Sequence, residues 1–219
     1  DAVREHLVAD DRGADGARGR LAHAHLGEAA ADHRAARDEA GDDDHDARTD
    51  SEHVALHQAL RAGRPEEIER LILTASGGPF RDRDPATFHA IRRDEALRHP
   101  TWSMGEKITI DSATLVNKGL ELIEARWLFG VAPERIDVVV HPRSIVHSLV
   151  EWCDGSLVAQ LAPNDMIYPI QYALAYPERW ENEFPRLALA EFGTLEFLPL
   201  DNRRFPAVQM ARAALAAGE

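Results

Sequence analysis

The chain has 219 residues, 44% of them hydrophobic, and a formal charge of −13 at pH 7. This length allows one large domain with a buried core. The negative charge and the lack of a basic cluster argue against a nucleic-acid partner. The sequence contains no apolar run of about 18 residues, the length that a membrane span needs. Cys153 is the single cysteine, so no internal disulfide is possible, and we expect a reducing, cytoplasmic compartment.

Residues 1–48 differ in composition from the rest of the chain. Residues 1–50 contain 14 Asp and Glu against 7 Arg, and the only large aliphatic residues before position 49 are three Leu and two Val. Such a segment buries too little apolar surface to offset its ordering entropy, so we expect disorder or loose helix. The bias is also typical of GC-rich DNA translated out of frame, a hypothesis that resequencing would test.

Residues 50–219 show patterns of both helices and strands. Ser51 is expected to cap the first helix, and Asp154-Gly155 between two apolar runs predicts a hairpin turn. Strands and helices mix without a regular βαβ repeat, which favours an α+β fold. The predicted helices are residues 51–60, 85–97, 169–176 and 206–217, and the predicted strands are residues 70–74, 136–140, 145–152, 157–161 and 195–197.

The segment 108–129 has the most distinctive pattern. Residues 108–110 are expected to end a strand, after which Asp111 and Ser112 cap a helix. One buried stripe of that helix is expected to hold, or lie close to, Leu115, Leu120, Ile123 and Leu128.

Polar residues near the start of this helix suggest a binding site. Asn117 and Glu121 are four positions apart and therefore lie on the same face. A helix N-terminus suits a phosphate, so Ser112, Asn117 and Lys118 can donate to an anion while Glu121 faces a cation. The alternative is a solvated polar face near a helix start.

Two loops are further candidates for ligand binding. The strand that ends at Thr74 runs into Ser76-Gly77-Gly78, where backbone N–H groups can approach an anion, although Gly-Gly-Pro is also an ordinary turn. The loop at residues 98–105 carries Trp102 and Met104, which suggests a lid over a substrate. The alternative is that Trp102 fills the core.

Five motifs in order resemble those of the 1-deoxy-D-xylulose 5-phosphate reductoisomerase family. They are Asp50-Ser-Glu-His, Thr74-Ala-Ser-Gly-Gly-Pro-Phe, His99-Pro-Thr-Trp-Ser-Met-Gly, Asp111-Ser-Ala-Thr-Leu-Val-Asn-Lys-Gly-Leu-Glu and His141-Pro-Arg-Ser-Ile-Val-His. The resemblance implies a catalytic domain at residues 49–200, with a mixed sheet packed against helices on one face, and the start of a connecting region at residues 201–219. The family's Gly-rich dinucleotide fingerprint, its Ala-Asn-Lys-Glu motif and its C-terminal helical domain do not occur in these 219 residues.

The resemblance also implies a reaction and its cofactors. Members rearrange 1-deoxy-D-xylulose 5-phosphate and reduce the product with NADPH to 2-C-methyl-D-erythritol 4-phosphate, in isoprenoid precursor synthesis. They use Mg²⁺, Mn²⁺ or Co²⁺ and form homodimers. We expect the 219 residues alone to be inactive. The alternatives are a non-catalytic dimerisation module and a metal-dependent phosphosugar isomerase or lyase that works without nicotinamide.

The resemblance assigns roles to individual residues. Asp50, Glu52 and Glu121 would bind the metal, with Glu52 and Glu121 acting in catalysis. Trp102 and Met104 would form the lid, and Gly105 would approach the nicotinamide. Lys118 is expected to point toward Ser76 and Ser112, away from solvent. The remaining substrate contacts would be Ser51 and Glu52 at the hydroxyketone end, and Ser76, His99, Ser112, Asn117 and Lys118 at the phosphate end, with Glu121 beside them.

Overall fold

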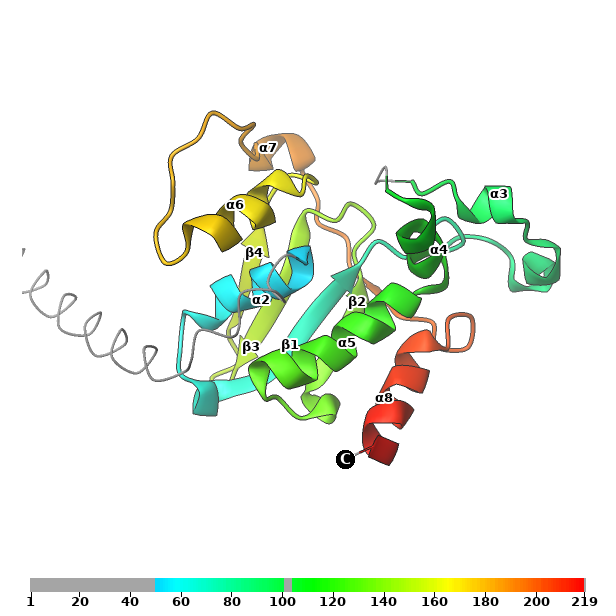
Figure 1. Ribbon diagram of the computed structural model, residues 1–219, viewed down its shortest axis with the longest axis horizontal. Helices are drawn as coiled ribbons and strands as arrows, with labels where there is room; N and C mark the ends of the chain where they lie inside the picture. Colours follow the sequence, from blue (N-terminus) through cyan, green and yellow to red (C-terminus); the bar gives the residue numbers. More distant parts are fainter. Residues whose placement is uncertain (1–49, 101–103, 219) are drawn as a thin grey trace, which may run out of the picture. The chain divides into compact units, whose positions relative to one another are not determined.

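A five-stranded mixed sheet, with strand order β4-β3-β1-β2-β5, is the centre of the computed structural model, which describes residues 50–100 and 104–218 (Figure 1). Strand β1 pairs in parallel with β2 and antiparallel with β3, and the pairs β3–β4 and β2–β5 are antiparallel. The strands are β1 (Ile68–Ala75), β2 (Ile136–Val140), β3 (Val146–Trp152), β4 (Leu157–Leu161) and β5 (Leu198–Pro199).

Helices of very different lengths connect the strands. The α-helices are α2 (Ser51–Leu60), α3 (Arg93–Ala96), α4 (Glu106–Thr114), α5 (Val116–Phe129), α6 (Ile167–Ala175), α7 (Leu189–Phe192) and α8 (Ala207–Gly218). Within the described ranges, three short 3₁₀ helices are η2 (Pro65–Glu67), η3 (Pro85–Ala90) and η4 (Pro133–Arg135). In the described part of the chain, no helix combines the length and the apolar character needed to span a bilayer.

The main core lies between one face of the sheet and helices α2, α5 and α8. Successive strand residues point to opposite faces, and Leu71 and Leu73 of β1, both 0% exposed, pack in one cluster with Leu56 of α2 and Leu122 of α5. Arg70 points to the other face and pairs with Asp137 and Glu151, at 2.7 and 2.5 Å. The predicted α+β fold, a mixed sheet with helices packed on one face, is confirmed.

The prediction of a strand at residues 108–110 is wrong. These residues lie inside α4, where the Thr109 hydroxyl donates to the Gly105 carbonyl oxygen at 2.8 Å. Alternation of Ile and Thr favours a strand locally, but tertiary context overrides such weak propensities. Ser112, expected to cap a helix, lies in the last turn of α4, and Leu115 in the left-handed conformation (φ 57°) separates α4 from α5.

Other predicted boundaries need correction. Asp50, not Ser51, caps α2, because its carboxylate accepts from the backbone N–H groups of Glu52 and His53. Residues 85–97 form η3 and the four-residue α3 instead of one helix, and the strand expected at residues 195–197 is the two-residue β5 at 198–199. Leu120 is 44% exposed rather than buried.

The hairpin and the helices at both ends agree with prediction. Strands β3 and β4 flank the turn at Asp154-Gly155, and α8 begins one residue after Pro206. The domain division at residue 200 stays a prediction. The interpretation of residues 1–48 and the placement of Trp102 lie outside the described residues.

Replacement of Leu122 by Ala should lower the free energy of unfolding by about 2–5 kcal/mol, since the side chain is fully buried between α5 and the sheet. Replacement of Leu120 by Ala is the matched control on the same helix and should change it by less than about 1 kcal/mol. Urea unfolding followed by circular dichroism measures both, and equal losses would contradict this placement of the core.

Candidate active site

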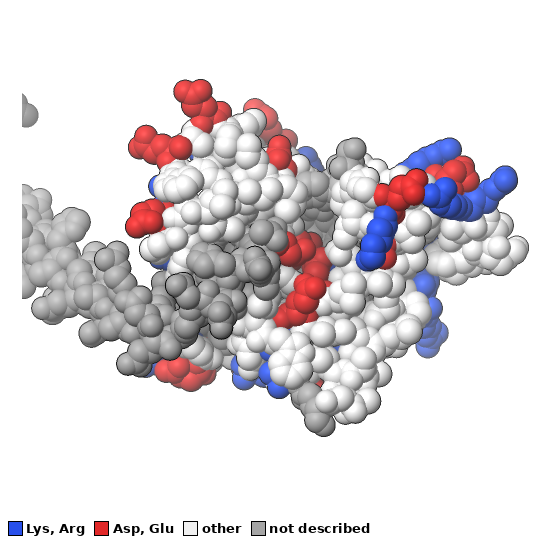
Figure 2. Space-filling model, viewed as in Figure 1, with Lys and Arg blue, Asp and Glu red and all other residues white. Residues whose placement is uncertain are grey.

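Three carboxylates from two helices converge at one end of a cavity. One oxygen each of Asp50, Glu52 and Glu121 lies within 4.8 Å of the other two. Asp50 and Glu52 stand at the start of α2, and Glu121 is in the second turn of α5. Acidic side chains gather at the surface between these helices (Figure 2). The side chain of Asp50 is 34% exposed.

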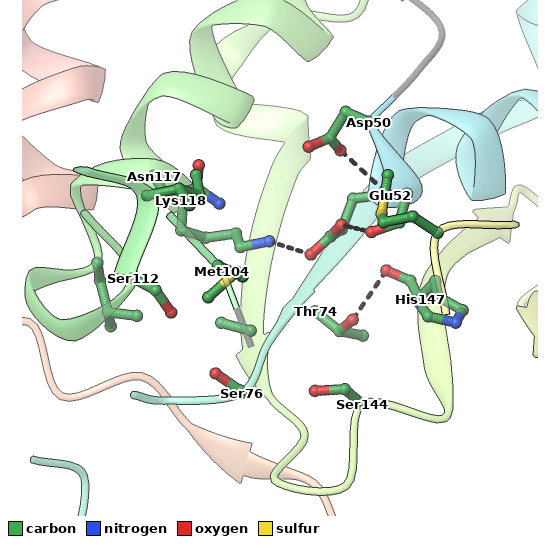
Figure 3. A pocket seen from close by; sticks show the side chains of 15 residues that line it. Asp50, Glu52, Thr74, Ser76, Met104, Ser112, Asn117, Lys118, Ser144 and His147 are labelled. Carbon is green, nitrogen blue, oxygen red and sulfur yellow. Dashed lines mark hydrogen bonds and ion pairs between the residues drawn. The ribbon is translucent and has the colours of Figure 1, made fainter. Parts of the chain in front are cut away.

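Lys118 supplies a positive charge to this cluster. Its ammonium donates to Glu52 Oε1 at 2.6 Å and to Glu121 Oε2, and its side chain is only 4% exposed. The prediction that Lys118 avoids bulk solvent is confirmed, whereas its expected orientation toward Ser76 and Ser112 is wrong. Figure 3 shows the ammonium turned toward Glu52. The physical reason for this orientation is that buried carboxylates need a cationic partner.

The balance of one ammonium against three carboxylates shifts their pKa values. Burial disfavours the charged form of Lys118, but Coulombic attraction to Glu121, Glu52 and Asp50 outweighs it and raises the lysine pKa. Burial raises the pKa of Glu121, and repulsion by Glu52 raises it further. Burial acts in the same direction on Glu52, but Lys118 overcomes it and the pKa of Glu52 is lowered. The cluster therefore carries excess negative charge when all three carboxylates are ionised.

Hydroxyl side chains occupy another part of the cavity, which has a volume of about 380 Å³. In Figure 3 the side chains of Ser76 and Ser144 lie well apart from Asp50. The Ser76 hydroxyl is 3.0 Å from His99 Nε2. The cavity is lined by Asp50, Ser51, Glu52, Thr74, Ala75, Ser76, Met104, Ile108, Ser112, Leu115, Asn117, Lys118, Ser144, His147 and Met166.

The α4–α5 junction positions the residues between the two ends. The left-handed Leu115 is 2% exposed, so its side chain anchors the break between the helices in a second core cluster with Phe80 and Phe205. Asn117 Nδ2 donates to Glu121 Oε1 at 2.5 Å, which confirms that these residues share a helical face. The first N–H groups of α5 have no acceptor within the helix, as at any helix start. An anion that enters the cavity can therefore meet donors from Ser112, Asn117 and the first turn of α5.

Two comparisons of sequence identify the family. The family described as 1-deoxy-D-xylulose 5-phosphate reductoisomerase C-terminal domain matches residues 47–129, and the family described as DXP reductoisomerase C-terminal domain matches residues 161–219. The chain is 61% identical over 170 residues to the 1-deoxy-D-xylulose 5-phosphate reductoisomerase of Thermomicrobium roseum and 57% identical over 169 residues to that of Anaeromyxobacter sp.. The chain belongs to the 1-deoxy-D-xylulose 5-phosphate reductoisomerase family.

Solved structures agree with this reductoisomerase assignment. A DOX-P reductoisomerase in complex with NADPH, fosmidomycin and magnesium superposes with a TM-score of 0.72 at 46% identity. The Zymomonas mobilis reductoisomerase in complex with NADPH gives a TM-score of 0.71 at 41% identity. Each alignment covers 78% of this chain and 44% of the solved chain. The chain likewise spans less than half the length of the curated relatives, 44% for the Thermomicrobium protein and 43% for the Anaeromyxobacter protein.

Most of the predicted reductoisomerase site residues lie at or beside the cavity. Ser51 lines the cavity together with the carboxylates of Asp50 and Glu52, and Met104, the described half of the predicted lid pair, also lines it. Glu121 lies behind them, 2% exposed. Gly105 is the N-cap residue of α4, and a Cβ added there would meet no atom of the described residues within 4 Å.

Three polar residues of the cavity were not assigned a role from the sequence. Thr74 donates its hydroxyl to the carbonyl oxygens of Val146 and His147, at 2.8 Å each. Ser144 has a positive φ of 49°, an unusual conformation of the kind that clusters at functional sites. His147 is 6% exposed, and burial lowers its pKa, so the imidazole is neutral near pH 7. The motif His141–His147 indicated this loop, but only the fold brings its residues into the cavity.

His53 supports two of the carboxylate residues from behind and was also not assigned. It is 1% exposed, and its Nε2 lies 3.1 Å from the Glu121 carbonyl oxygen, which can only accept, so Nε2 is the protonated nitrogen. Its Nδ1 is 3.6 Å from Asp50 Oδ1. Its position i+3 from Asp50 on α2 was the available signal.

Replacement of Glu121 by Gln should weaken Mn²⁺ binding by at least about tenfold, because a nearly isosteric change removes one charged ligand. Isothermal titration calorimetry measures the affinity. Glu134→Gln, at an exposed position of η4, is the control for loss of one acidic charge and should leave the affinity unchanged. Equal affinities of Glu121→Gln and the unmodified chain would contradict the assignment.

The affinity for Mn²⁺ should also fall as the pH is lowered, and the fall should begin above the pH at which an ordinary solvated glutamate titrates. A proton competes with the cation for Glu121, whose pKa is raised, whereas Glu52, with a lowered pKa, stays ionised over the same range. Titrations between about pH 8 and about pH 5 test this, and an affinity that stays constant down to the usual glutamate range would argue against it.

Proposed function

We propose that residues 50–218 are the catalytic part of an enzyme that rearranges 1-deoxy-D-xylulose 5-phosphate and reduces the product with NADPH to 2-C-methyl-D-erythritol 4-phosphate. The observation that carries the proposal is the convergence of Asp50, Glu52 and Glu121 at the edge of a cavity that also contains Ser76, Ser112 and Lys118. Its volume is in the range of small-molecule sites, about 300–1,000 Å³.

The three carboxylates fit a hard divalent cation. Their ligand atoms are close enough to share one ion, and oxygen ligands suit Mg²⁺ and Mn²⁺, with Co²⁺ as a further candidate. The magnesium in the related DOX-P reductoisomerase crystal structure supports this choice. When bound, the cation stabilises negative charge on the carbonyl and hydroxyl oxygens of a hydroxyketone. Glu52 and Ser51, which contact each other at the start of α2, would orient that end of the substrate.

The hydroxyl-rich part of the cavity would hold the phosphate. Ser76, Ser112 and Asn117 line it and offer neutral donors, and the N-terminus of α5 favours an anion through its dipole. His99, within hydrogen-bond distance of the Ser76 hydroxyl, would orient that hydroxyl toward the phosphate. Lys118 stands between the two ends and would supply the cation that a phosphate dianion needs.

Reduction requires NADPH beside the rearranged carbon skeleton. Met104 lines the cavity and would cover the substrate together with Trp102. At Gly105, the N-cap residue of α4, an added Cβ would meet no described residue within 4 Å, so a nicotinamide would have room to approach. NADPH in the two related solved structures supports this cofactor. The same comparison favours the reductoisomerase over an isomerase or lyase that works without nicotinamide.

A homodimer is the proposed assembly. Strand β4 lies at an edge of the sheet, where its backbone groups can pair with another strand. Leu157 at its start is 55% exposed. Strand β4 is a different element from the helices that carry the carboxylate cluster. A dimer contact through β4 would therefore be compatible with catalysis, and it does not favour the alternative of a non-catalytic dimerisation module.

A chimera tests the proposed activity. The 170 matched residues of the Thermomicrobium roseum protein are replaced by those of this chain, and oxidation of NADPH is followed by absorbance with Mn²⁺ and 1-deoxy-D-xylulose 5-phosphate. The chimera should be active. A bound cation supplies several kcal/mol of transition-state stabilisation, so Glu121→Gln in the chimera should lower the rate by at least about 100-fold, or about 2.7 kcal/mol.

The 219-residue chain alone is the companion sample and should not oxidise NADPH, because positioning of the nicotinamide supplies much of the rate. A chimera that folds and binds Mn²⁺ but never oxidises NADPH would overturn the proposed reaction.

A further inference from the structure

The position of the Lys118 ammonium has a consequence for metal binding. It donates to Glu52 and Glu121, two of the three carboxylates that can share a cation. The side chains of Lys118 and Glu121 are 4% and 2% exposed, so water does little to screen their charges. The lysine therefore acts as the counter-ion of the carboxylate cluster in the structure described above.

A divalent cation and this ammonium compete for the same two carboxylates, Glu52 and Glu121. A cation held by Glu52 and Glu121 would stand within a few ångströms of an ammonium bonded to the same carboxylates, and like charges at that separation repel strongly in a buried site. The dication attracts the carboxylates more strongly than a single positive charge does. Once the dication is bound, Glu52 and Glu121 no longer attract the Lys118 ammonium strongly enough to hold it beside them.

The displaced ammonium has a second place in the same cavity. Lysine carries its charge on a flexible four-carbon stem, and Lys118 lies one residue from Asn117 at the start of α5. In the view of Figure 3, the Lys118 ammonium lies between Asp50 on one side and Ser112 and Ser76 on the other. These groups are neutral, so the ammonium gains a charged partner there only when an anion is bound.

We propose that Lys118 is an exchangeable internal counter-ion, displaced from Glu52 and Glu121 by the divalent cation and then used to bind the phosphate. This inference rests on the proposed function, because it takes the metal and phosphate ends of the cavity from there. It makes the binding of cation and phosphate mutually favourable, and each ligand must raise the affinity for the other by the same factor.

The composition of the chain allows a direct observation. Its sequence contains two lysines, Lys107 and Lys118, so a sample labelled with ¹³C at the lysine Cε should give two side-chain signals. Lys107 is 86% exposed and pairs with Asp111, and it serves as the internal reference. Addition of Mg²⁺ should shift the Lys118 signal, and methylphosphonate should shift it again, while the Lys107 signal stays in place.

Linkage measured by calorimetry tests the exchange itself. Methylphosphonate should tighten Mn²⁺ binding to the unmodified chain by about tenfold. Lys118→Met removes the competing ammonium, so Mn²⁺ should bind about tenfold more tightly without methylphosphonate, and methylphosphonate should no longer change that affinity. Lys107→Met loses the same charge at an exposed position and should behave like the unmodified chain.

The outcomes separate this inference from the proposed function. If Mg²⁺ and Mn²⁺ do not bind at all, the metal site itself is wrong. If they bind but the Lys118 signal does not move, or if methylphosphonate still tightens Mn²⁺ binding in Lys118→Met, the carboxylate site stands and the exchange is refuted. The labelled unmodified chain gives this answer even if Lys118→Met does not fold.

Discussion

The burial of Lys118 with Glu52 and Glu121 is the interaction on which the rest of the site depends. A carboxylate 2% exposed, such as Glu121, cannot keep its charge without a partner in the interior. Helix α5 supplies that partner from its own first turn, three residues before Glu121, and α2 brings Glu52 to the same point. Because both helices pack on one face of the sheet, the charges meet at the place where the core fixes the distance between the helices.

Helix α5 carries core and site residues at adjacent positions. Glu121 faces the carboxylate cluster, while Leu122, 0% exposed, faces the sheet. On its other side, Gly119 allows α8 to approach, because an added Cβ would lie 2.9 Å from the Ala207 carbonyl oxygen. Rotation of α5 by even one residue would exchange polar and apolar neighbours. The packing of α5 against the sheet and α8 thus also sets the geometry of the charges.

The sequence predicted which residues come together at the cavity better than it predicted the local structure around them. The Asn117–Glu121 pair followed from helical spacing alone, because both residues lie within one regular helix. The break at Leu115 had no such signal, since a leucine in the left-handed conformation is held there by burial and not by its own propensity. The strand expected at residues 108–110 was wrong for the related reason that α4 is stabilised by its surroundings. Local patterns do not contain contacts made 60 or more residues away, such as the pair of Lys118 with Glu52.

The direction in which the Lys118 side chain points could not be predicted from the sequence either, because it depends on the balance of charges around the ammonium. With a phosphate bound, the same side chain has reason to point toward Ser76 and Ser112; without one, three carboxylates offer it the stronger attraction. A lysine that already neutralises part of the cluster's charge would also limit which ions can enter. A monovalent cation brings no more charge than the ammonium it would displace, so it gains little by the exchange, whereas a dication gains one further unit of attraction to each carboxylate. On the proposed exchange, the internal ammonium would favour divalent over monovalent ions through charge alone, and the oxygen geometry of Asp50, Glu52 and Glu121 would decide among divalent ions.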